Sequence, residues 1–348
     1  MNKHNFIGAR ICIHNFAKDL STRCDKSVSY LERDIIRAKR LNHIALDEYE
    51  WIGYYNLDEE RKQTVSTLWT RTELRKKYTK RLYKAVLMDK DIFARVYSKY
   101  FGRAYVTTKE MTKADFEKLA QGYEKLVYKP FTKGGGSGVK VLRTASAQER
   151  DAAYEEITRM KPGVVEQWIS QHPEMEKLSP KAVNIIRIYS VNTPAGAYMF
   201  SPILTVARKK EIANGCQDAL TAVADIRTGK VLTDAVDQGN SETYEKHPQT
   251  EIVFKGFQIP YWEEIIEMMK EVVKFTTFIS NIGWDIAITP DGPVLIEGNT
   301  IPGFNTAQFR GYHELTDGYG YQPIFDEAVK GIPFTNLERY EKVLIKLR

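Results

Sequence analysis

Two acidic residues near the C-terminal end of the sequence lie in a pattern that suits a divalent cation. The segment 284–304 reads as strand, turn and strand, because 290–292 (Pro-Asp-Gly) is strong turn chemistry. With those three residues as the loop, Asp285 lies opposite Glu297. Side chains alternate along a strand, so Asn299 shares the face of Glu297. The sequence therefore predicts that these three side chains converge on one side of a hairpin.

This prediction depends on the register of the hairpin. A three-residue loop pairs Thr289 with Pro293 and carries the ladder on to Asp285 and Glu297. A slip of one residue would break the acidic pair, although Glu297 and Asn299 would still share a face.

Two carboxylates that face each other repel, so a further group must offset the repulsion. Mg²⁺ prefers oxygen ligands and is typically held by one or two carboxylates together with substrate phosphates. The alternative is a solvated hairpin whose acids are incidental. The strongly apolar runs beside the acids, 286–288 and 294–296, favour the metal site.

A glycine-rich segment follows a β-like run that ends at 128–130 (Tyr-Lys-Pro). Glycines let backbone N–H groups approach an anion closely, and Lys129 would add a positive charge on phosphates. The alternative is the flexible tip of a hairpin. The spacing excludes a Walker A loop, and the H-R-D and D-F-G motifs of protein kinases are absent from the sequence. The segment comprises Gly134, Gly135, Gly136, Ser137 and Gly138.

The elements that must position these residues change in character along the chain. Residues 20–100 are rich in helix formers, with one glycine and no proline, and predict helices. Alternating apolar runs then predict strands at 126–131, 139–142, 164–169, 182–191, 197–206 and 219–226, with helices at 146–160 and 261–280. We expect a helical region over 1–100, a small α+β lobe over 101–180 and a larger lobe over 181–348.

Composition is that of an ordinary globular protein of 348 residues, with a net charge of +6. No apolar run reaches the roughly 18 residues of a membrane span, and no signal peptide is apparent. Three cysteines at no metal-ligand spacing predict reduced thiols and a cytoplasmic location. The basic run 71–81 is interpreted as a solvated helix face, or alternatively as a contact with an anionic substrate or polymer. Nucleic acid is not an expected partner.

In their order along the chain, these motifs resemble the ATP-grasp enzymes, and most closely the sugar-transfer-associated branch found near polysaccharide-assembly genes. The resemblance covers about residues 87–304 and implies two α+β lobes that clamp ATP, with Mg²⁺ as the second cofactor. The segments that carry it are 89–91 (Asp-Lys-Asp), 127–130 (Val-Tyr-Lys-Pro), the glycine segment, 165–169 (Val-Glu-Gln-Trp-Ile), 184–187 (Asn-Ile-Ile-Arg), Asp285 and 297–299 (Glu-Gly-Asn).

The resemblance also implies roles for individual residues. Lys90 and Lys129 would contact the ATP phosphates or the edge of adenine. Arg187 would contact the phosphates or an acyl phosphate. The alternatives are a surface lysine for Lys90, an exposed strand acid for Glu166 and a structural ion pair for Arg187. The hinge strand beside adenine would comprise Glu166, Gln167, Trp168 and Ile169, and Glu174 would reach the ribose.

The implied chemistry is attack of a carboxylate on ATP to give an acyl phosphate, which an amine then converts to an amide. Ligases that join D-alanines carry an arginine where this chain has Gly283, so another cation must bind the carboxylate. Candidates are Arg208, Lys209 and Lys210, for which a solvated charge cluster is the alternative. Arg310, just after the metal strand, is another candidate.

We therefore expect a ligase of surface-polysaccharide biosynthesis whose small-molecule partners are a carboxylate and an amine, such as a sugar acid and an amino acid. One alternative keeps the fold but phosphorylates a hydroxyl, as some ATP-grasp kinases do. The other is a non-enzymatic binder of anionic polymers, which would use the basic run 71–81 and ignore ATP.

Overall fold

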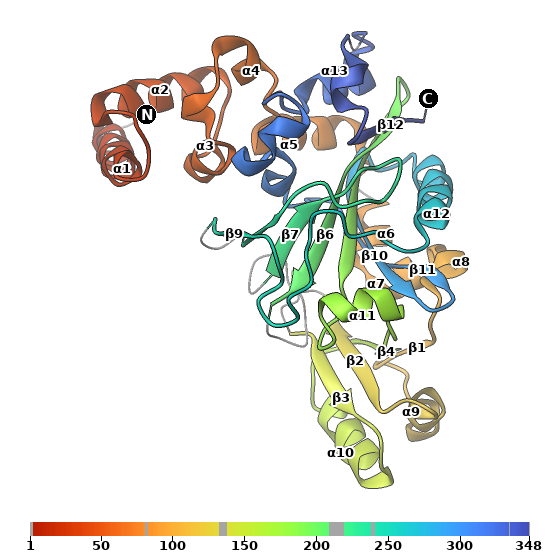
Figure 1. Ribbon diagram of the computed structural model, residues 1–348. Helices are drawn as coiled ribbons and strands as arrows, with labels where there is room; N and C mark the ends of the chain where they lie inside the picture. Colours follow the sequence, from red (N-terminus) through yellow and green to blue (C-terminus); the bar gives the residue numbers. More distant parts are fainter. Residues whose placement is uncertain are drawn as a thin grey trace.

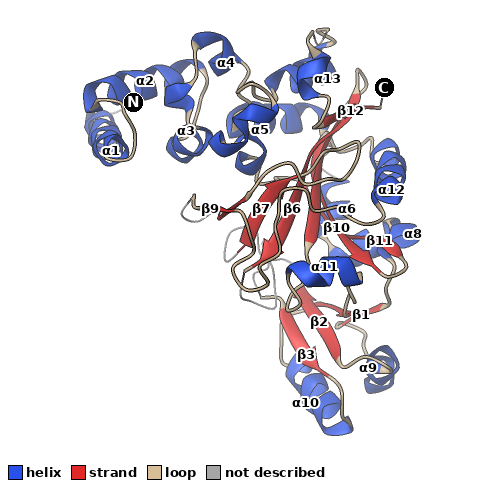
Figure 2. Cartoon of the chain, in the orientation of Figure 1, coloured by secondary structure: helices blue, strands red, loops and turns tan. Residues whose placement is uncertain are grey.

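Two antiparallel sheets and a helical region make up the molecule, as the computed structural model in Figure 1 shows. The structure describes residues 3–80, 83–131, 138–208, 219–237, 241–333 and 335–347. Helices and strands are both abundant, which makes the fold a mixed α+β one (Figure 2). Within these ranges, no helix is both long enough and apolar enough to cross a bilayer.

The smaller sheet has four strands in the order β1-β4-β2-β3. Strand β2 buries Leu126 and Tyr128 against helices α9 and α10, and its alternate residues face the other way. Ser146 caps α10 by accepting a hydrogen bond from the N–H of Glu149. The bounds are β1 Tyr105–Thr107, β2 Lys125–Pro130, β3 Lys140–Arg143, β4 Gly163–Gln167, α9 Lys113–Ala120 and α10 Ala147–Thr158.

The larger sheet runs in the order β11-β10-β5-β6-β7-β8-β9, with β12 paired to β6. Every residue of β6 is buried, because α12 covers one face of the sheet and α13 with the nearby turns covers the other. The bounds are β5 Ile185–Asn192, β6 Ala197–Ala207, β7 Ala219–Val223, β8 Ala235–Asp237, β9 Thr243–Tyr244, β10 Asn281–Thr289, β11 Gly292–Asn299, β12 Leu344–Lys346, α11 Pro173–Leu178, α12 Trp262–Phe275 and α13 Gln322–Lys330.

The helical region divides into two parts. Its first helices form a separate apolar core and project from one side of the molecule, whereas α6 and α8 pack against β11 (Figure 1). The bounds are α1 Lys3–Ser21, α2 Val28–Leu41, α3 Leu46–Ile52, α4 Glu59–Gln63, α5 Leu68–Tyr78, α6 Lys84–Met88, α7 Lys90–Val96 and α8 Ser98–Phe101.

Two sequence-based expectations about helices need correction. Helix α12 ends at Phe275, not at residue 280, because the Asn192 side chain donates to the carbonyls of Val273 and Thr276 and so caps the last turn. The basic run 71–81 is not simply a solvated face. Arg71 is buried, forms an ion pair with Glu48 and stacks on the ring of Phe304.

Candidate functional site

The hairpin of β10 and β11 places Asp285 opposite Glu297, as predicted, but by a different route. Its loop has two residues, not three, so Thr289 pairs with Gly292 and the predicted Thr289–Pro293 pairing is wrong. The Thr289 hydroxyl stabilises the shorter turn, since it donates to the Gly292 carbonyl at 2.9 Å. A β-bulge at Ile296 then supplies the extra residue that brings the two acids opposite each other.

The three predicted oxygen-bearing side chains do meet on one face of this hairpin. The Nδ2 atom of Asn299 lies 3.2 Å from Oδ2 of Asp285 and 3.1 Å from Oε1 of Glu297. On the opposite face, a Cβ atom at Gly298 would lie 3.1 Å from the ring of Trp284. The indole of Trp284 is buried and donates to the Ser190 hydroxyl at 2.9 Å. The hairpin therefore has one apolar face and one acidic face.

Arg187, on the neighbouring strand β5, lies directly against Asp285. Its Nε and Nη2 atoms donate to the two carboxylate oxygens at 2.7 and 2.6 Å. Burial lowers the pKa of Arg187, but the Asp285 carboxylate outweighs that effect and holds the pKa above its ordinary value. Burial raises the pKa of Asp285; Arg187 opposes this rise and the Glu297 carboxylate adds to it. The two residues thus form an ion pair with a second acid, Glu297, beside it.

The side chain of Arg187 also passes over Gly283. A Cβ atom at Gly283 would lie 3.7 Å from Cδ of Arg187 and 2.7 Å from Cβ of Pro302. No larger residue fits at position 283 without moving these neighbours. The aliphatic part of the Arg187 side chain, from the adjacent strand, thus lies against Gly283.

A second group of charges lies on the smaller sheet. Lys129 and Arg103 each contact Oε2 of Glu166 at 2.8 Å. Burial raises the pKa of Glu166, but the two cations outweigh it and hold the pKa below its ordinary value. Glu166 is buried, so the alternative interpretation of an exposed strand acid is wrong.

Lys90, at the start of α7, connects the two charged groups. Its Nζ atom donates to the carbonyl of Pro130 at 3.1 Å. Burial and the charge of Lys129 lower the pKa of Lys90, whereas Glu297 and Glu166 raise it. Lys90 is therefore partly buried, and it is influenced by the charges of both the acidic hairpin and the ion pairs of the smaller sheet.

Other predicted nucleotide-binding residues are less closely tied to this group. Strand β4 ends at Gln167, so the half-buried Trp168 and Ile169 follow it as a linker. Trp168 packs under the Lys125 ammonium. Glu174 is exposed and paired with Lys177 at 2.7 Å. Of the glycine segment, only Gly138 falls within the described residues, with a φ of +79°; Gly134, Gly135, Gly136 and Ser137 lie outside them.

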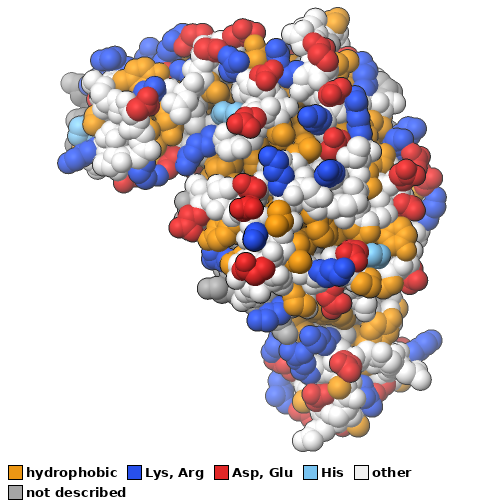
Figure 3. All heavy atoms as spheres, viewed as in Figure 1, with side chains coloured by type: hydrophobic (Ala, Val, Ile, Leu, Met, Phe, Trp, Pro, Cys, Tyr) orange, Lys and Arg blue, Asp and Glu red, His pale blue; other side chains and the backbone are white. Residues whose placement is uncertain are grey.

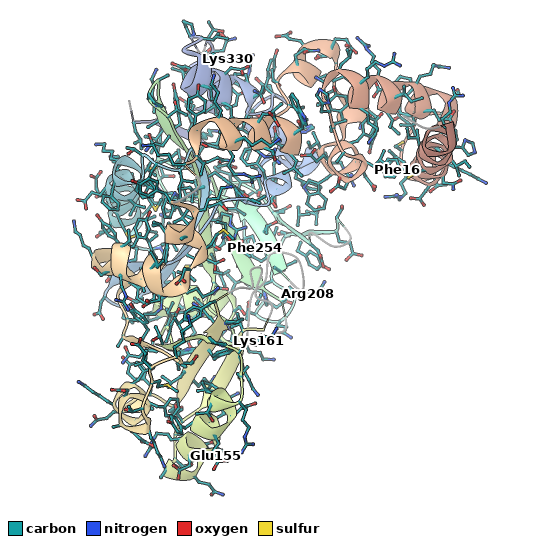
Figure 4. The ribbon with its side chains drawn as sticks, turned by 180° about the vertical axis from the view of Figure 1, so that it is seen from behind. Phe16, Glu155, Lys161, Arg208, Phe254 and Lys330 are labelled. Carbon is teal, nitrogen blue, oxygen red and sulfur yellow. The ribbon has the colours of Figure 1, made fainter. Side chains whose placement is uncertain are left out.

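The extra cations proposed for the carboxylate substrate are separated from one another. Arg208 lies at the end of the larger sheet that faces the smaller sheet (Figure 4). There it contacts Asp237 at 2.8 Å and the Tyr244 hydroxyl at 3.3 Å. Arg310 instead donates to the carbonyl of Glu50 in the helical region. Lys209 and Lys210 lie outside the described residues. Figure 3 shows Lys and Arg side chains gathered where the two sheets meet.

Sequence reasoning missed Arg103. It follows Gly102 at the end of α8, in a segment with no recognisable motif. Its role is apparent only from contacts with residues in three separate segments, namely Phe101, Glu166 and Leu295. No local sequence pattern indicates these contacts.

The donor set on the hairpin fits a hard divalent cation. Asp285 and Glu297 supply carboxylate oxygens that repel each other, and the side-chain amide of Asn299, whose Nδ2 donates to both acids, lies on the same face. Among the residues that the structure describes, no group of three or more histidine, cysteine and acidic side chains is arranged to hold a metal. A cation at this hairpin would therefore rely on two carboxylates, one amide and the oxygens of a bound phosphate.

One family of known proteins matches most of the chain. The model of a family described as sugar-transfer associated ATP-grasp matches residues 70–317. No curated protein sequence matches the chain.

Several solved structures are similar in fold. They include D-alanine–D-alanine ligase from Coxiella burnetii, with 14% identity, a TM-score of 0.43, and coverage of 71% of this chain and 57% of that one. D-alanyl-alanine synthetase A from Vibrio cholerae has 15% identity, a TM-score of 0.45, and coverage of 71% and 65%. The ATP-grasp ligase PsnB, complexed with minimal precursor, Mg and ADP, has 12% identity, a TM-score of 0.41, and coverage of 73% and 61%. The chain thus spans less than two thirds of each of these three proteins.

Proposed function

The chain belongs to the sugar-transfer associated ATP-grasp family, and from this premise we propose that it is an ATP- and Mg²⁺-dependent ligase that joins a carboxylate to an amine. The family match also confirms the α+β ATP-grasp fold expected from the sequence. The observation that carries the proposal is the convergence of Asp285, Glu297 and Asn299 on one face of the hairpin, with Lys90 close by.

The two charged groups suit the phosphates of a nucleoside triphosphate and the Mg²⁺ that accompanies them. Lys129 and Lys90 would bind the phosphates, and the segment 166–169 would lie beside the adenine, with Glu174 at the ribose. Asp285, Glu297 and Asn299 would hold Mg²⁺. When bound, Mg²⁺ neutralises phosphate charge and so favours attack by an anionic nucleophile.

In the first step, a substrate carboxylate oxygen bonds to the γ-phosphorus of ATP, and the bond between that phosphorus and the β–γ bridging oxygen breaks to release ADP. The guanidinium of Arg187 lies against Asp285, one of the proposed Mg²⁺ ligands. From that position Arg187 would stabilise the negative charge on the transferred phosphoryl group. In the second step, an amine attacks the acyl carbon, and inorganic phosphate leaves as the amide forms and the amine loses a proton. Neither step needs a protein nucleophile.

We further propose that the substrates are small molecules used in surface-polysaccharide biosynthesis, such as a sugar acid and an amino acid. Arg208 is a candidate to bind the carboxylate substrate, because it lies at the end of β6 that faces the smaller sheet. The need for ATP and the free thiols of Cys12 and Cys24 are compatible with a cytoplasmic location.

A phosphate-release screen tests the proposal. The purified full chain would be incubated with ATP, Mg²⁺ and each pairing of a panel of uronic acids with a panel of amino acids and amines. We expect one chemical class of pair to release phosphate, and mass spectrometry of the product to show an amide. Glu297→Gln serves as the inactive control.

The products separate this proposal from its alternatives. A phosphorylated product without free phosphate would instead identify a kinase that acts on a hydroxyl. A chain that binds neither ATP nor ATP with Mg²⁺, but binds polyanions in a strongly salt-dependent way, would contradict the enzymatic proposal altogether.

A further inference from the structure

Arg103 is a buried arginine that the proposed reaction does not use. Its side chain is 4% exposed, and it lies in the short connection between α8 and β1 where the chain passes from the larger sheet to the smaller one. A buried guanidinium requires several hydrogen-bond acceptors, because an unpaired buried charge is strongly destabilising. The identity of its acceptors therefore indicates what it holds together.

The first acceptor is on the smaller sheet. Nε of Arg103 donates to Oε2 of Glu166 at 2.8 Å, and the same oxygen accepts from Lys129. The next residue, Ala104, extends this attachment, since its N–H donates to the side chain of Gln167 and its carbonyl accepts from the N–H of Gln167. Arg103 is thus fixed to β4, beside a lysine proposed to bind phosphate.

Two further acceptors are on the edge strand of the larger sheet. Nη1 of Arg103 donates to the carbonyl of Leu295 at 2.8 Å, and Nη2 lies 3.5 Å from the carbonyl of Ile296. Successive carbonyls of a regular strand point in opposite directions, so one side chain reaches both only where the strand is irregular. Here that irregularity is the bulge that brings Glu297 opposite Asp285.

The turn before Arg103 is shaped for this contact. Gly102 has a φ of +62°, and a Cβ atom there would lie 2.4 Å from Cγ1 of Val294. Glycine alone permits both the left-handed conformation and the close approach of the chain to β11. The guanidinium also stacks 3.5 Å from the centroid of the Phe101 ring and donates to the Phe101 carbonyl, which fixes its orientation.

We infer that Arg103 is a positioning residue: it holds the bulge of β11 to the Glu166–Lys129 pair and so fixes the cation-binding acids relative to the phosphate-binding lysine. This inference rests on the proposed function, because it assigns Arg103 the task of aligning the two halves of one ATP–Mg²⁺ site. Groups that orient metal ligands in this way typically change metal affinity by about 10- to 100-fold when they are removed.

The test measures how strongly Mg²⁺ promotes ATP binding. ATP would be titrated into the full-length chain by calorimetry, first with EDTA and then at increasing Mg²⁺ concentrations. For Arg103→Met, we expect the half-saturating Mg²⁺ concentration to rise by about 10- to 100-fold, with a smaller change in ATP affinity in EDTA. Arg103→Lys keeps a charge for Glu166 but loses the simultaneous contacts, so we expect a smaller, several-fold rise.

Lys62→Met is the matched control. Lys62 is a buried cation with 6% exposure, it pairs with Asp34 at 2.6 Å, and both residues lie in the helical region. Its loss should destabilise the chain in thermal unfolding without changing the Mg²⁺ dependence. Because Arg103→Met could fail to fold, Arg103→Lys provides the same readout in a milder variant.

The outcomes separate the inference from the proposed function. If wild type binds ATP with Mg²⁺ and a folded Arg103 variant keeps the wild-type Mg²⁺ dependence, the inference is wrong and the proposed function stands. If Lys62→Met raises the Mg²⁺ requirement as much as Arg103→Met does, the effect is general destabilisation and the inference is also wrong. If wild type binds no ATP, both are wrong.

Discussion

At the scale of single residues, the site depends on a balance of charges on one face of a hairpin. Asp285 forms a two-hydrogen-bond ion pair with Arg187, whereas Glu297 accepts from the amide of Asn299 and is attracted by the nearby Lys90. This asymmetry suggests different roles for the two acids. We expect Asp285 to contribute to the fold as well as to the proposed site, and Glu297 to contribute mainly to binding.

Replacing Glu297 by Gln should therefore abolish function without harming the fold. We expect ATP turnover to fall by roughly 100-fold or more, because a charged ligand is lost where charge must be stabilised. The melting temperature should stay the same or rise, since repulsion with Asp285 is relieved. Turnover would be followed as ADP formation, and unfolding by circular dichroism.

Asp291→Asn, at the exposed tip of the same hairpin, is the matched control and should keep wild-type turnover. Near-normal turnover in Glu297→Gln would contradict the metal assignment.

Whereas the Glu297 variant should keep its fold, a variant that breaks the Arg187–Asp285 ion pair should lose stability. Arg187→Met leaves the buried Asp285 carboxylate without its cation, so we expect the free energy of unfolding to fall by about 3 kcal/mol. The double variant Arg187→Met with Asp285→Asn should recover much of this loss, because no charge is then buried alone. Urea denaturation of both single variants and the double variant measures this coupling; simple additivity would show that the pair contributes little to stability.

At the scale of elements, the two sheets are connected through buried charges on β4 and β2. Glu166 joins Lys129 of the smaller sheet to Arg103, which reaches the carbonyls of β11. Because its pKa lies below the ordinary value, Glu166 is charged in the folded chain at neutral pH, and these contacts depend on that charge.

This arrangement predicts how stability changes with pH. A carboxyl whose pKa is lowered by folding stabilises the fold above its ordinary value of 4.5, and this contribution is lost as the pH falls through the folded pKa. Wild type should therefore be more stable than Glu166→Gln at pH 7, and the difference should shrink below pH 4.5. Thermal unfolding of both proteins across this range tests the prediction. A stability difference between wild type and Glu166→Gln that is independent of pH would show that the charge of Glu166 does not stabilise the fold.

The sequence predicted most of these elements but not the connections between them. Apolar alternation located β2 to within one residue and β6 likewise, since burial of one or both faces fixes such patterns. The pairing of Asp285 with Glu297 was also correct. The bulge at Ile296 could not be predicted, because it is stabilised by Arg103, which is far away in the sequence. Tertiary contacts of this kind leave no local periodicity.

At the scale of the whole molecule, the helical region is fastened to the larger sheet by polar contacts as well as by packing. Ser66 exchanges two backbone hydrogen bonds with the side chain of Gln308, at 2.9 and 2.8 Å. Arg71 lies between Glu48 and the ring of Phe304. Phe304 follows the acidic hairpin closely in the sequence. The helices that precede residue 70 are thus part of the structure that supports the site.

The segment matched by the family should therefore not be stable alone. A shortened chain of residues 70–317 would leave the buried Arg71 without Glu48 and Gln308 without Ser66, and it would remove β12 and α13 from the larger sheet. We expect it to lack the cooperative thermal unfolding of the full chain, measured by circular dichroism. A shortened chain that unfolds cooperatively near the full-length melting temperature would contradict this view of the helical region.

The apolar face of the hairpin has a practical consequence. Trp284 lies one residue before Asp285, and its ring packs against Gly298, between Glu297 and Asn299. The fluorescence emission of an indole depends on the local electric field. Charge that binds at the acidic face of the hairpin would therefore shift the emission of Trp284. The chain therefore carries an intrinsic fluorophore at its acidic site, which would allow occupancy to be followed optically without a label.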